Sequence, residues 1–384
     1  MIAVLRICCA LVLLCVAAHA ETSRFEFRDG DRVVFLGGGF FERDLRYGYI
    51  ETFLTTRFHD KNLTFRNLAW SGDTVFGDAR AGFDSAKEGY ERLKTRIVEA
   101  KPTVIFLQTG QNESFDGESM LPQYLDGLSR LLTDLESTGA RIVLLSPTLL
   151  ENLGPPLPDP TAQNENVRRY ASALKQVATE RNYFFVDLAR PLDSGFNSGS
   201  TLHTDNGLHF TEYGYWKLGQ EIVAALGHPL PMSMKPTEQP FQLDREVFFS
   251  PHMPLSAPPA ARSAALHQVL QFEGLADGNY KLVHESGGIA SASALEWNTG
   301  VSLATAPEVI QVEELRKVII EKNRLFFNQW RPQNETYIFG FRKYEQGRFQ
   351  EETPQFDPLI AELEKRISEL RVPKSHTYRL VQEQ

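Results

Sequence analysis

Four polar loops of this chain carry residues that could bind or transform a small molecule: residues 37–43, 71–74, 110–114 and 203–209. The first loop opens with three consecutive glycines, whose backbone N–H groups are not obstructed by side chains. Such a turn could hold an anion or let a substrate approach closely. The glycines provide no nucleophile, so any reacting hydroxyl must come from another loop or from water.

Strand and helix patterns alternate over the first 230 residues and explain how these loops could meet. The expected strands are residues 33–36, 63–68, 102–108, 140–145 and 183–188, and the expected helices are 47–58, 86–100, 121–137, 162–181 and 212–226. This alternation predicts a three-layer α/β domain over residues 21–230, with a parallel sheet between helices. Because the carboxyl ends of parallel strands share one edge, the four polar loops should converge there.

The rest of the chain has a different character. Prolines cluster over residues 231–265, which indicates a linker or a wrapping segment. Short strand-type runs at 268–272, 278–283 and 294–301 predict a small β-rich unit over residues 266–305. Helical spacing then returns, so residues 306–384 are expected to form a C-terminal helical segment that packs on the α/β domain.

The N-terminal residues indicate export. Residues 2–18 are nearly all apolar, and Ala18-His19-Ala20 is a small-x-small cleavage site. We therefore expect a signal peptide over residues 1–20 and a secreted or periplasmic protein; an uncleaved anchor is the alternative. No other stretch is long and apolar enough to span a bilayer, so no transmembrane segment is expected after cleavage.

Composition narrows the chemistry further. All three cysteines lie at positions 8, 9 and 15, so the mature chain would have no disulfide, no thiolate nucleophile and no cysteine metal site. Cys15 as a lipid attachment site is disfavoured because Leu14 stands where such signals need a small residue. The net charge of -9 argues against nucleic acid as the main partner. No cofactor signature is present, and neither a cofactor nor a metal is expected.

Together the four polar loops resemble the SGNH (GDSL-type) hydrolases, a family of flavodoxin-like α/β esterases. In that family the four sequence blocks supply a serine nucleophile, an oxyanion-hole glycine, an oxyanion-hole asparagine within Gly-x-Asn, and a histidine base preceded three residues earlier by an aspartate. The resemblance covers roughly residues 32–226 and implies that Gly72 and Asn112 form the oxyanion hole and His209 is the base. The segments 70–74, 206–209 and 330–337 also resemble a divergent branch of secreted bacterial proteins.

Two departures from the family pattern affect catalysis. The nucleophile position is Gly39, and glycine cannot attack a carbonyl. The orienting aspartate is replaced by Asn206, although Asp205 is adjacent and could approach the imidazole if the loop adjusts. An asparagine can hold the histidine in one tautomer, but it cannot stabilise the imidazolium as an anion does.

Three interpretations of the site remain open. In the first, the protein hydrolyses an ester with His209 as base, and water or a hydroxyl such as that of Ser71 or Thr74 attacks. In the second, the pocket only binds a ligand, and Trp70, Trp330 and Tyr337 stack on a sugar or another planar group. The third is an acid/base pair or a metal site built from acidic residues and histidines: Glu42, Asp73, Glu113, Asp205, His203 and His209.

Several of these residues also suit purely structural roles. The three glycines could be only a tight turn, Asn112 could cap the next helix, and the aromatic residues suit core or domain-interface positions. Beyond the residues named by the resemblance, the candidates for lining a ligand site are Trp70, Asp73, Glu113, Trp330 and Asn334.

The sequence thus predicts an SGNH-type hydrolase that acts on an acyl or acetyl ester of a carbohydrate or small extracellular molecule. The alternative is a catalytically inactive ligand-binding or carbohydrate-binding module on the same scaffold.

Overall fold

A computed structural model describes residues 24–192, 202–230, 233–235, 246–248, 253–255, 258, 269–345 and 349–383. The expected signal peptide over residues 1–20, with all three cysteines, lies outside these ranges, as does most of the expected linker over residues 231–265. Within the described ranges, no helix has both the length and the apolar character needed to cross a membrane.

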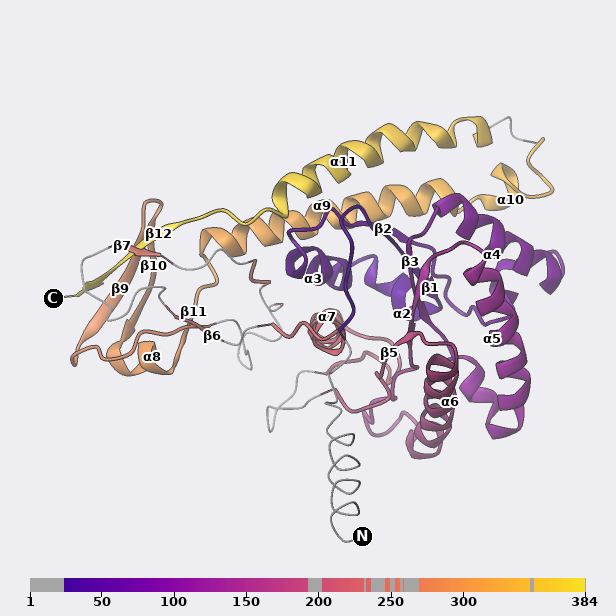
Figure 1. Cartoon of the computed structure of the whole chain (residues 1–384), viewed down its shortest axis with the longest axis horizontal. Helices are drawn as coiled ribbons and strands as arrows, with labels where there is room; N and C mark the ends of the chain where they lie inside the picture. Colours follow the sequence, from indigo (N-terminus) through magenta and orange to yellow (C-terminus); the bar gives the residue numbers. More distant parts are fainter. Residues whose placement is uncertain are drawn as a thin grey trace, which may run out of the picture.

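A five-stranded parallel sheet with helices on both faces forms the larger part of the protein (Figure 1). Its strands are β1 (Arg32–Gly37), β2 (Thr64–Asn67), β3 (Val104–Gln108), β4 (Arg141–Leu145) and β5 (Phe184–Val186), in the order β2-β1-β3-β4-β5. The helices are α2 (Gly39–Asp44), α3 (Tyr49–Arg57), α4 (Ala86–Ala100), α5 (Leu121–Glu136), α6 (Thr161–Glu180) and α7 (Glu212–Ala225). The predicted α/β fold class is confirmed.

Alternation along β1 explains the two layers of helices. Val33 and Phe35 belong to a hydrophobic core shared with α3 and α7, whereas Val34 and Leu36 belong to a second core shared with α4, α5 and α6. All four side chains are at most 2% exposed. Because successive side chains of a strand point to opposite faces, a continuous apolar run is what a doubly covered strand requires.

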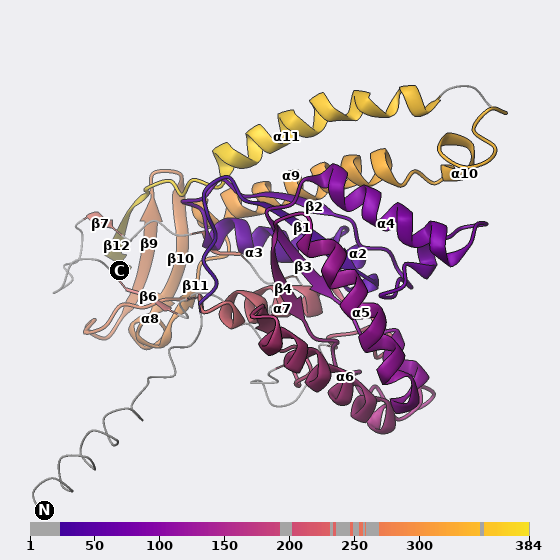
Figure 2. The same ribbon diagram turned by 45° about the vertical axis from the view of Figure 1, so that its right-hand side comes forward.

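Two small sheets lie at the other end of the molecule in both views (Figures 1 and 2). The four-stranded antiparallel sheet contains β10 (Gly287–Ser293), β9 (Asn279–His284), β12 (Thr377–Gln382) and β7 (Glu246–Phe248), and the three-stranded sheet contains β11 (Val301–Ser302), β8 (Val269–Leu270) and β6 (Ser233–Met234). Two strands therefore fall in the expected linker. A third, β12, ends the segment that was expected to be helical.

One expected strand is wrong. Residues 294–301 begin with helix α8 (Ala294–Thr299), and only β11 follows as a two-residue strand. Ser293 Oγ accepts from the backbone N–H of Glu296, and the Glu296 carboxylate accepts from the backbone N–H of Ser293 at 2.8 Å. This capping box satisfies donors at the helix start and overrides the strand-like pattern of the apolar residues.

The C-terminal helices pack on the α/β domain. They are α9 (Pro307–Trp330), α10 (Glu335–Ile338) and α11 (Phe356–Leu370); short 3-10 turns lie at Asp78–Arg80, Glu113–Asp116, Glu118–Met120, Phe349–Glu351 and Thr353–Gln355. Val312, Leu315 and Ile319 of α9 join the core formed with α3 and α7. Buried Lys322 of α9 donates to the Glu51 carboxylate of α3 at 2.7 Å. Because the pair is buried, loss of either partner would leave the other charge buried and uncompensated, which is strongly destabilising.

Candidate active site

The strand order places a topological switch point between β1 and β3. The chain leaves β1 for β2 on one side and returns to β3 on the other, and such points leave a crevice at the carboxyl ends of the strands. Gly37, the last residue of β1, has a φ of +134°, and a β-carbon there would lie 2.1 Å from the carbonyl oxygen of Gln108 at the end of β3. Only glycine permits this close approach of the two strand ends.

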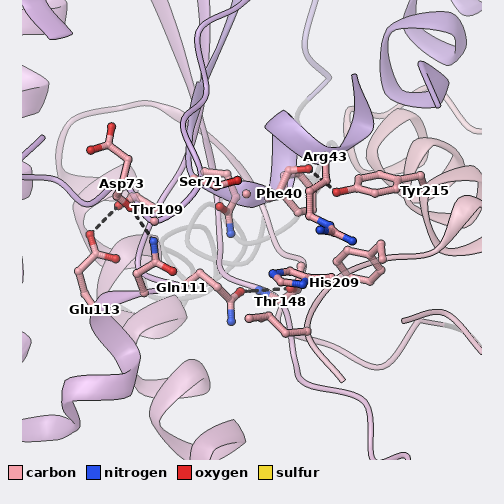
Figure 3. A pocket seen from close by; sticks show the side chains of 17 residues that line it. Phe40, Arg43, Ser71, Asp73, Thr109, Gln111, Glu113, Thr148, His209 and Tyr215 are labelled. Atoms are coloured by element: carbon pink, nitrogen blue, oxygen red, sulfur yellow. Dashed lines mark hydrogen bonds between the residues drawn. The ribbon is translucent and has the colours of Figure 1, made fainter. Parts of the chain in front are cut away.

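A single pocket lies at this switch point and contains residues from all four polar loops (Figure 3). Its cavity volume is about 80 Å³. The lining residues are Gly38, Gly39, Phe40, Arg43, Ser71, Gly72, Asp73, Gln108, Thr109, Gln111, Asn112, Glu113, Thr148, Leu208, His209, Phe210 and Tyr215. The structure therefore brings together Gly39, Ser71, Gly72, Asn112 and His209 from distant parts of the sequence.

The Ser71 hydroxyl lies beside the position where the family's serine would stand. A β-carbon on Gly39, the first residue of α2, would lie 3.4 Å from Ser71 Oγ and 4.0 Å from Arg43 Cδ. Ser71 is exposed, and its Oγ has no hydrogen-bond partner among the described residues. Its backbone N–H donates to the Glu42 carboxylate, which also binds Arg331 at 3.1 Å. The C-terminal segment therefore contacts the residues that position this loop.

Two further groups could donate to a developing oxyanion. Gly72 has a φ of +82°, its backbone N–H has no acceptor among the described residues, and a β-carbon there would meet nothing within 4 Å. The Asn112 amide donates one proton to the Asp73 carbonyl at 2.7 Å, which leaves its second proton free. Its side chain does not cap the short helix that follows, so the capping interpretation of Asn112 is wrong.

Asn206 holds His209 in an unexpected tautomer. The Asn206 Oδ1 atom accepts from the backbone N–H groups of Leu208 at 3.1 Å and of His209 at 2.8 Å. Since only the oxygen can accept, the amide NH₂ must face His209 Nδ1, which lies 3.1 Å away. Nδ1 is therefore the acceptor, and the neutral imidazole carries its proton on Nε2. In a serine–histidine–aspartate triad the proton lies on Nδ1 instead.

The charges around His209 oppose its protonation. Its pKa is lowered mainly by burial and then by the nearby Arg43 guanidinium, while Asp205 acts in the opposite sense. Asp205 does not bond to the imidazole, contrary to the expectation that it could replace the missing aspartate. Its carboxylate pairs with Arg43 at 3.0 Å instead. His209 is thus held neutral and poised as a hydrogen-bond donor through Nε2.

The other acidic candidates have separate structural partners. Asp73 pairs with the buried Arg80 at 2.6 Å, and burial raises the pKa of its carboxyl. Glu113 accepts from the backbone N–H groups of Val75 and Gly110, and burial raises its pKa too. Both residues line the pocket, but their side chains stabilise the loops that surround it.

The metal interpretation finds no cluster to support it. Across the described ranges, no group of three or more histidine, cysteine, aspartate or glutamate side chains could hold a metal ion. Glu42 and Asp205 pair with arginines, and His203 lies 3.4 Å from Glu151, outside this pocket.

Three of the predicted ligand-lining residues lie outside the pocket. The Arg331 guanidinium stacks over Trp70, with its central carbon 3.6 Å from the centroid of the Trp70 ring. Trp70 also packs edge to face against Trp330, with 5.9 Å between the ring centroids. Trp330 is 5% exposed, and Asn334 lies on the surface. Trp70 and Trp330 are therefore residues of the interface with the C-terminal helices.

Sequence reasoning missed Arg43, Gln111 and Thr148. Arg43 lies one helical turn after Gly39, a spacing that places both on one face of a short helix and could have signalled a shared site. Gln111 and Thr148 gave no such signal; the Thr148 backbone N–H donates to the Gln111 side-chain oxygen at 2.7 Å across two loops.

Comparisons with known proteins found one family model and several solved structures that this chain resembles. Residues 36–217 match the GDSL-like Lipase/Acylhydrolase family. Among solved structures, a gut microbial diltiazem-metabolizing enzyme superposes with a TM-score of 0.71 at 17% identity and covers 95% of this chain and 100% of its own. An acetyl xylan esterase from Geobacillus stearothermophilus gives a TM-score of 0.39 at 16% identity and covers 55% and 99%. A search of curated proteins returned no match.

The superposition with the diltiazem-metabolizing enzyme spans nearly the whole of both chains, so the two proteins share their fold beyond the α/β domain. The order of the four loops, their convergence on one pocket and the family match identify the central domain. Residues 36–217 of this chain belong to the GDSL-like lipase/acylhydrolase family.

Proposed function

We propose that this protein hydrolyses a small ester, of the acetyl-ester class, on a carbohydrate or another small extracellular molecule. The observation that carries the proposal is the pocket itself, which gathers the Ser71 hydroxyl, the Gly72 N–H, the Asn112 amide and His209. Its cavity volume of about 80 Å³ suits an acetyl group and is far below the ~300 Å³ or more of pockets for larger ligands.

In the proposed reaction Ser71 Oγ attacks the ester carbonyl. The Gly72 N–H and the second amide proton of Asn112 donate hydrogen bonds to the oxyanion that forms. A donor directly after the nucleophile is the arrangement that α/β-hydrolases use, so the neighbouring positions of Ser71 and Gly72 favour this assignment. The alcohol leaves with a proton, and water then attacks the acyl-serine to release the acid and restore the hydroxyl.

His209 can take the proton of Ser71 only through a deprotonated Nε2. The imidazole must therefore move its proton to Nδ1 and lose the bond from Asn206, which has a free-energy cost of about 1 kcal/mol. Among the described residues no carboxylate bonds to the imidazole, since Asp205 pairs with Arg43 and acts on His209 only at a distance. Replacing the carboxylate of a triad lowers kcat about 10⁴-fold. The proposed enzyme is accordingly slow.

The test is turnover of a chromogenic acetyl ester by purified protein without residues 1–20. Ser71→Ala, Asn112→Ala and His209→Ala should each lower kcat/KM by at least about tenfold. Thr74→Ala is the matched control, because Thr74 belongs to the same loop, lies outside the pocket and directs its hydroxyl to Asp78. Equal rates in all variants would reject hydrolysis at this site.

A catalytically inactive binding module is the second candidate. The observation that favours it is the Asn206–His209 bond, which holds the imidazole in the tautomer that cannot act as a base. Saturable binding of a non-hydrolysable acetamide analogue, without turnover of the ester, would favour this candidate over the first.

We also propose that the protein is secreted or periplasmic and that residues 1–20 are its signal peptide. The apolar run and the small-x-small site before Glu21 support this proposal. N-terminal sequencing of protein exported by a bacterial host should begin at Glu21, and a retained Met1 in the exported fraction would contradict it.

A further inference from the structure

Three residues that line the pocket carry hydrogen-bond donors without an acceptor among the described residues. Asn206 occupies Nδ1 of His209, and Nε2 has no partner among the described residues. The Gly72 N–H has no acceptor within the described chain either. Arg43 gives only its Nη2 atom to Asp205, and its Nε atom is buried without a partner among the described residues. All three residues line the same cavity.

The negative charges of the pocket lie elsewhere. Figure 3 shows Asp73 and Glu113 on the opposite side of the pocket from Arg43 and His209. Asp73 is neutralised by Arg80, and Glu113 is enclosed by backbone donors. The groups that act on His209 itself are Arg43, Arg46 and Asp205, two positive charges against one negative. Because Arg43 and Asp205 pair with each other, what this side of the pocket offers an anion is the buried, unpartnered Nε of Arg43 rather than a net charge.

From this geometry we propose that the pocket binds a carboxylate anion, which the His209 Nε2–H, the Gly72 N–H and the Arg43 guanidinium receive together. Asn206 is the positioning residue, because its amide forces the imidazole proton onto Nε2. A carboxylate has one charge and two acceptor oxygens, which matches one arginine and two neutral donors. The inference holds whether or not the pocket hydrolyses an ester; if it does, the acid product is the bound anion.

This assignment reverses the role that the family gives to the histidine. A base must present a lone pair to its substrate, whereas His209 presents a proton. The replacement of aspartate by asparagine and the replacement of serine by Gly39 then act together. The first makes the imidazole a donor, and the second removes a side chain from the space where an anion would lie.

The tautomer can be measured directly. Long-range ¹H–¹⁵N NMR of protein labelled at histidine should show His209 protonated at Nε2 and not at Nδ1 at neutral pH. Titration with sodium acetate should shift the His209 and Gly72 signals saturably. Acetamide has the same shape without the charge, so at equal ionic strength it should bind at least about tenfold more weakly.

Three variants sharpen the test. Arg43→Gln should weaken acetate binding about tenfold or more, because a charged donor is lost. Arg46→Gln is the matched control; this exposed arginine lies outside the pocket, and its loss should change affinity by about twofold at most. Asn206→Asp keeps the shape of the side chain but should move the imidazole proton to Nδ1 and weaken acetate binding.

Each outcome is decisive. A proton on Nδ1 in the unmodified protein would overturn the donor role of His209. Equal affinity for acetate and acetamide, or no saturable shift with either, would overturn the anion site. Acetate binding that depends on Arg43, together with no ester turnover, would support this inference and reject only the proposed hydrolysis.

Discussion

Replacing Asn206 by aspartate should convert His209 from a donor into a base. The two side chains have the same shape, and a carboxylate oxygen of the variant can still accept from the backbone N–H groups of Leu208 and His209, which lie 3.1 and 2.8 Å from Oδ1 of Asn206. The amide NH₂ at 3.1 Å from Nδ1 is replaced by an anionic acceptor. Nδ1 must then carry the proton, which leaves the Nε2 lone pair facing the pocket.

The size of the effect follows from that one bond. A hydrogen bond to a charged group contributes about 1.5–3 kcal/mol, which equals about 1–2 pKa units. Asn206 is exposed and His209 is only partly buried, so solvent screening places the expected rise in the pKa of His209 near the lower limit, about one unit. Base catalysis of ester hydrolysis should increase at least about tenfold, since the favoured tautomer changes as well.

Two assays test this prediction. NMR titration of His209 should give a pKa below its ordinary value of 6.5 in the unmodified protein, because burial and Arg43 disfavour the cation, and a higher pKa in Asn206→Asp. Since the base must be neutral, the acidic limb of the pH–rate profile should move upward with that pKa. An unchanged or lower pKa in the variant would refute the assignment of the Asn206–His209 bond.

Three further substitutions test the site and its frame. Gly39→Ser should raise ester turnover, because it restores a hydroxyl at the family's nucleophile position. The variant should also fold normally, since its new β-carbon would lie no closer than 3.4 Å to Ser71 Oγ; a kinetic assay and a thermal melt check the two expectations. Gly37→Ala should destabilise the fold by about 3 kcal/mol or more in chemical denaturation, since its β-carbon would clash with a strand carbonyl at 2.1 Å and its φ is +134°; an unchanged midpoint would contradict the strand register. Arg80→Gln should lower the free energy of unfolding by about 3–5 kcal/mol at neutral pH, because it leaves the Asp73 carboxylate buried and unpaired. The pKa of Asp73 is already raised by burial, so the folded variant takes up a proton more readily than the unfolded chain, and its deficit should shrink as the pH falls.

The α/β domain could be predicted closely because its signals are local and repeated. The expected helix over residues 86–100 coincides with α4, where Ser85 and Glu88 form a capping box. The apolar run before Gly37 predicted a strand, and β1 is a strand whose two faces belong to two hydrophobic cores. The order of the four loops then sufficed to predict which of them would meet, since parallel strands share one carboxyl edge.

The features that the sequence did not disclose depend on contacts between distant segments. β12 was unexpected because its partners, β9 and β7, lie about 100 residues or more away along the chain. The contact of Arg331 with Trp70 depends on how α9 packs and has no local signal. The tautomer of His209 follows from which atom of Asn206 faces the ring, and that choice is made by two backbone donors that become visible only in three dimensions.

We propose that Ser71 is the nucleophile of an ester-hydrolysing pocket. The most direct measurement is peptide mass spectrometry after reaction with a fluorophosphonate, which forms a bond from a serine oxygen to phosphorus and releases fluoride. We expect a single adduct on Ser71 that is abolished in Ser71→Ala and reduced in His209→Ala. An unmodified Ser71, with ester turnover intact or with the adduct on another residue, would contradict the claim.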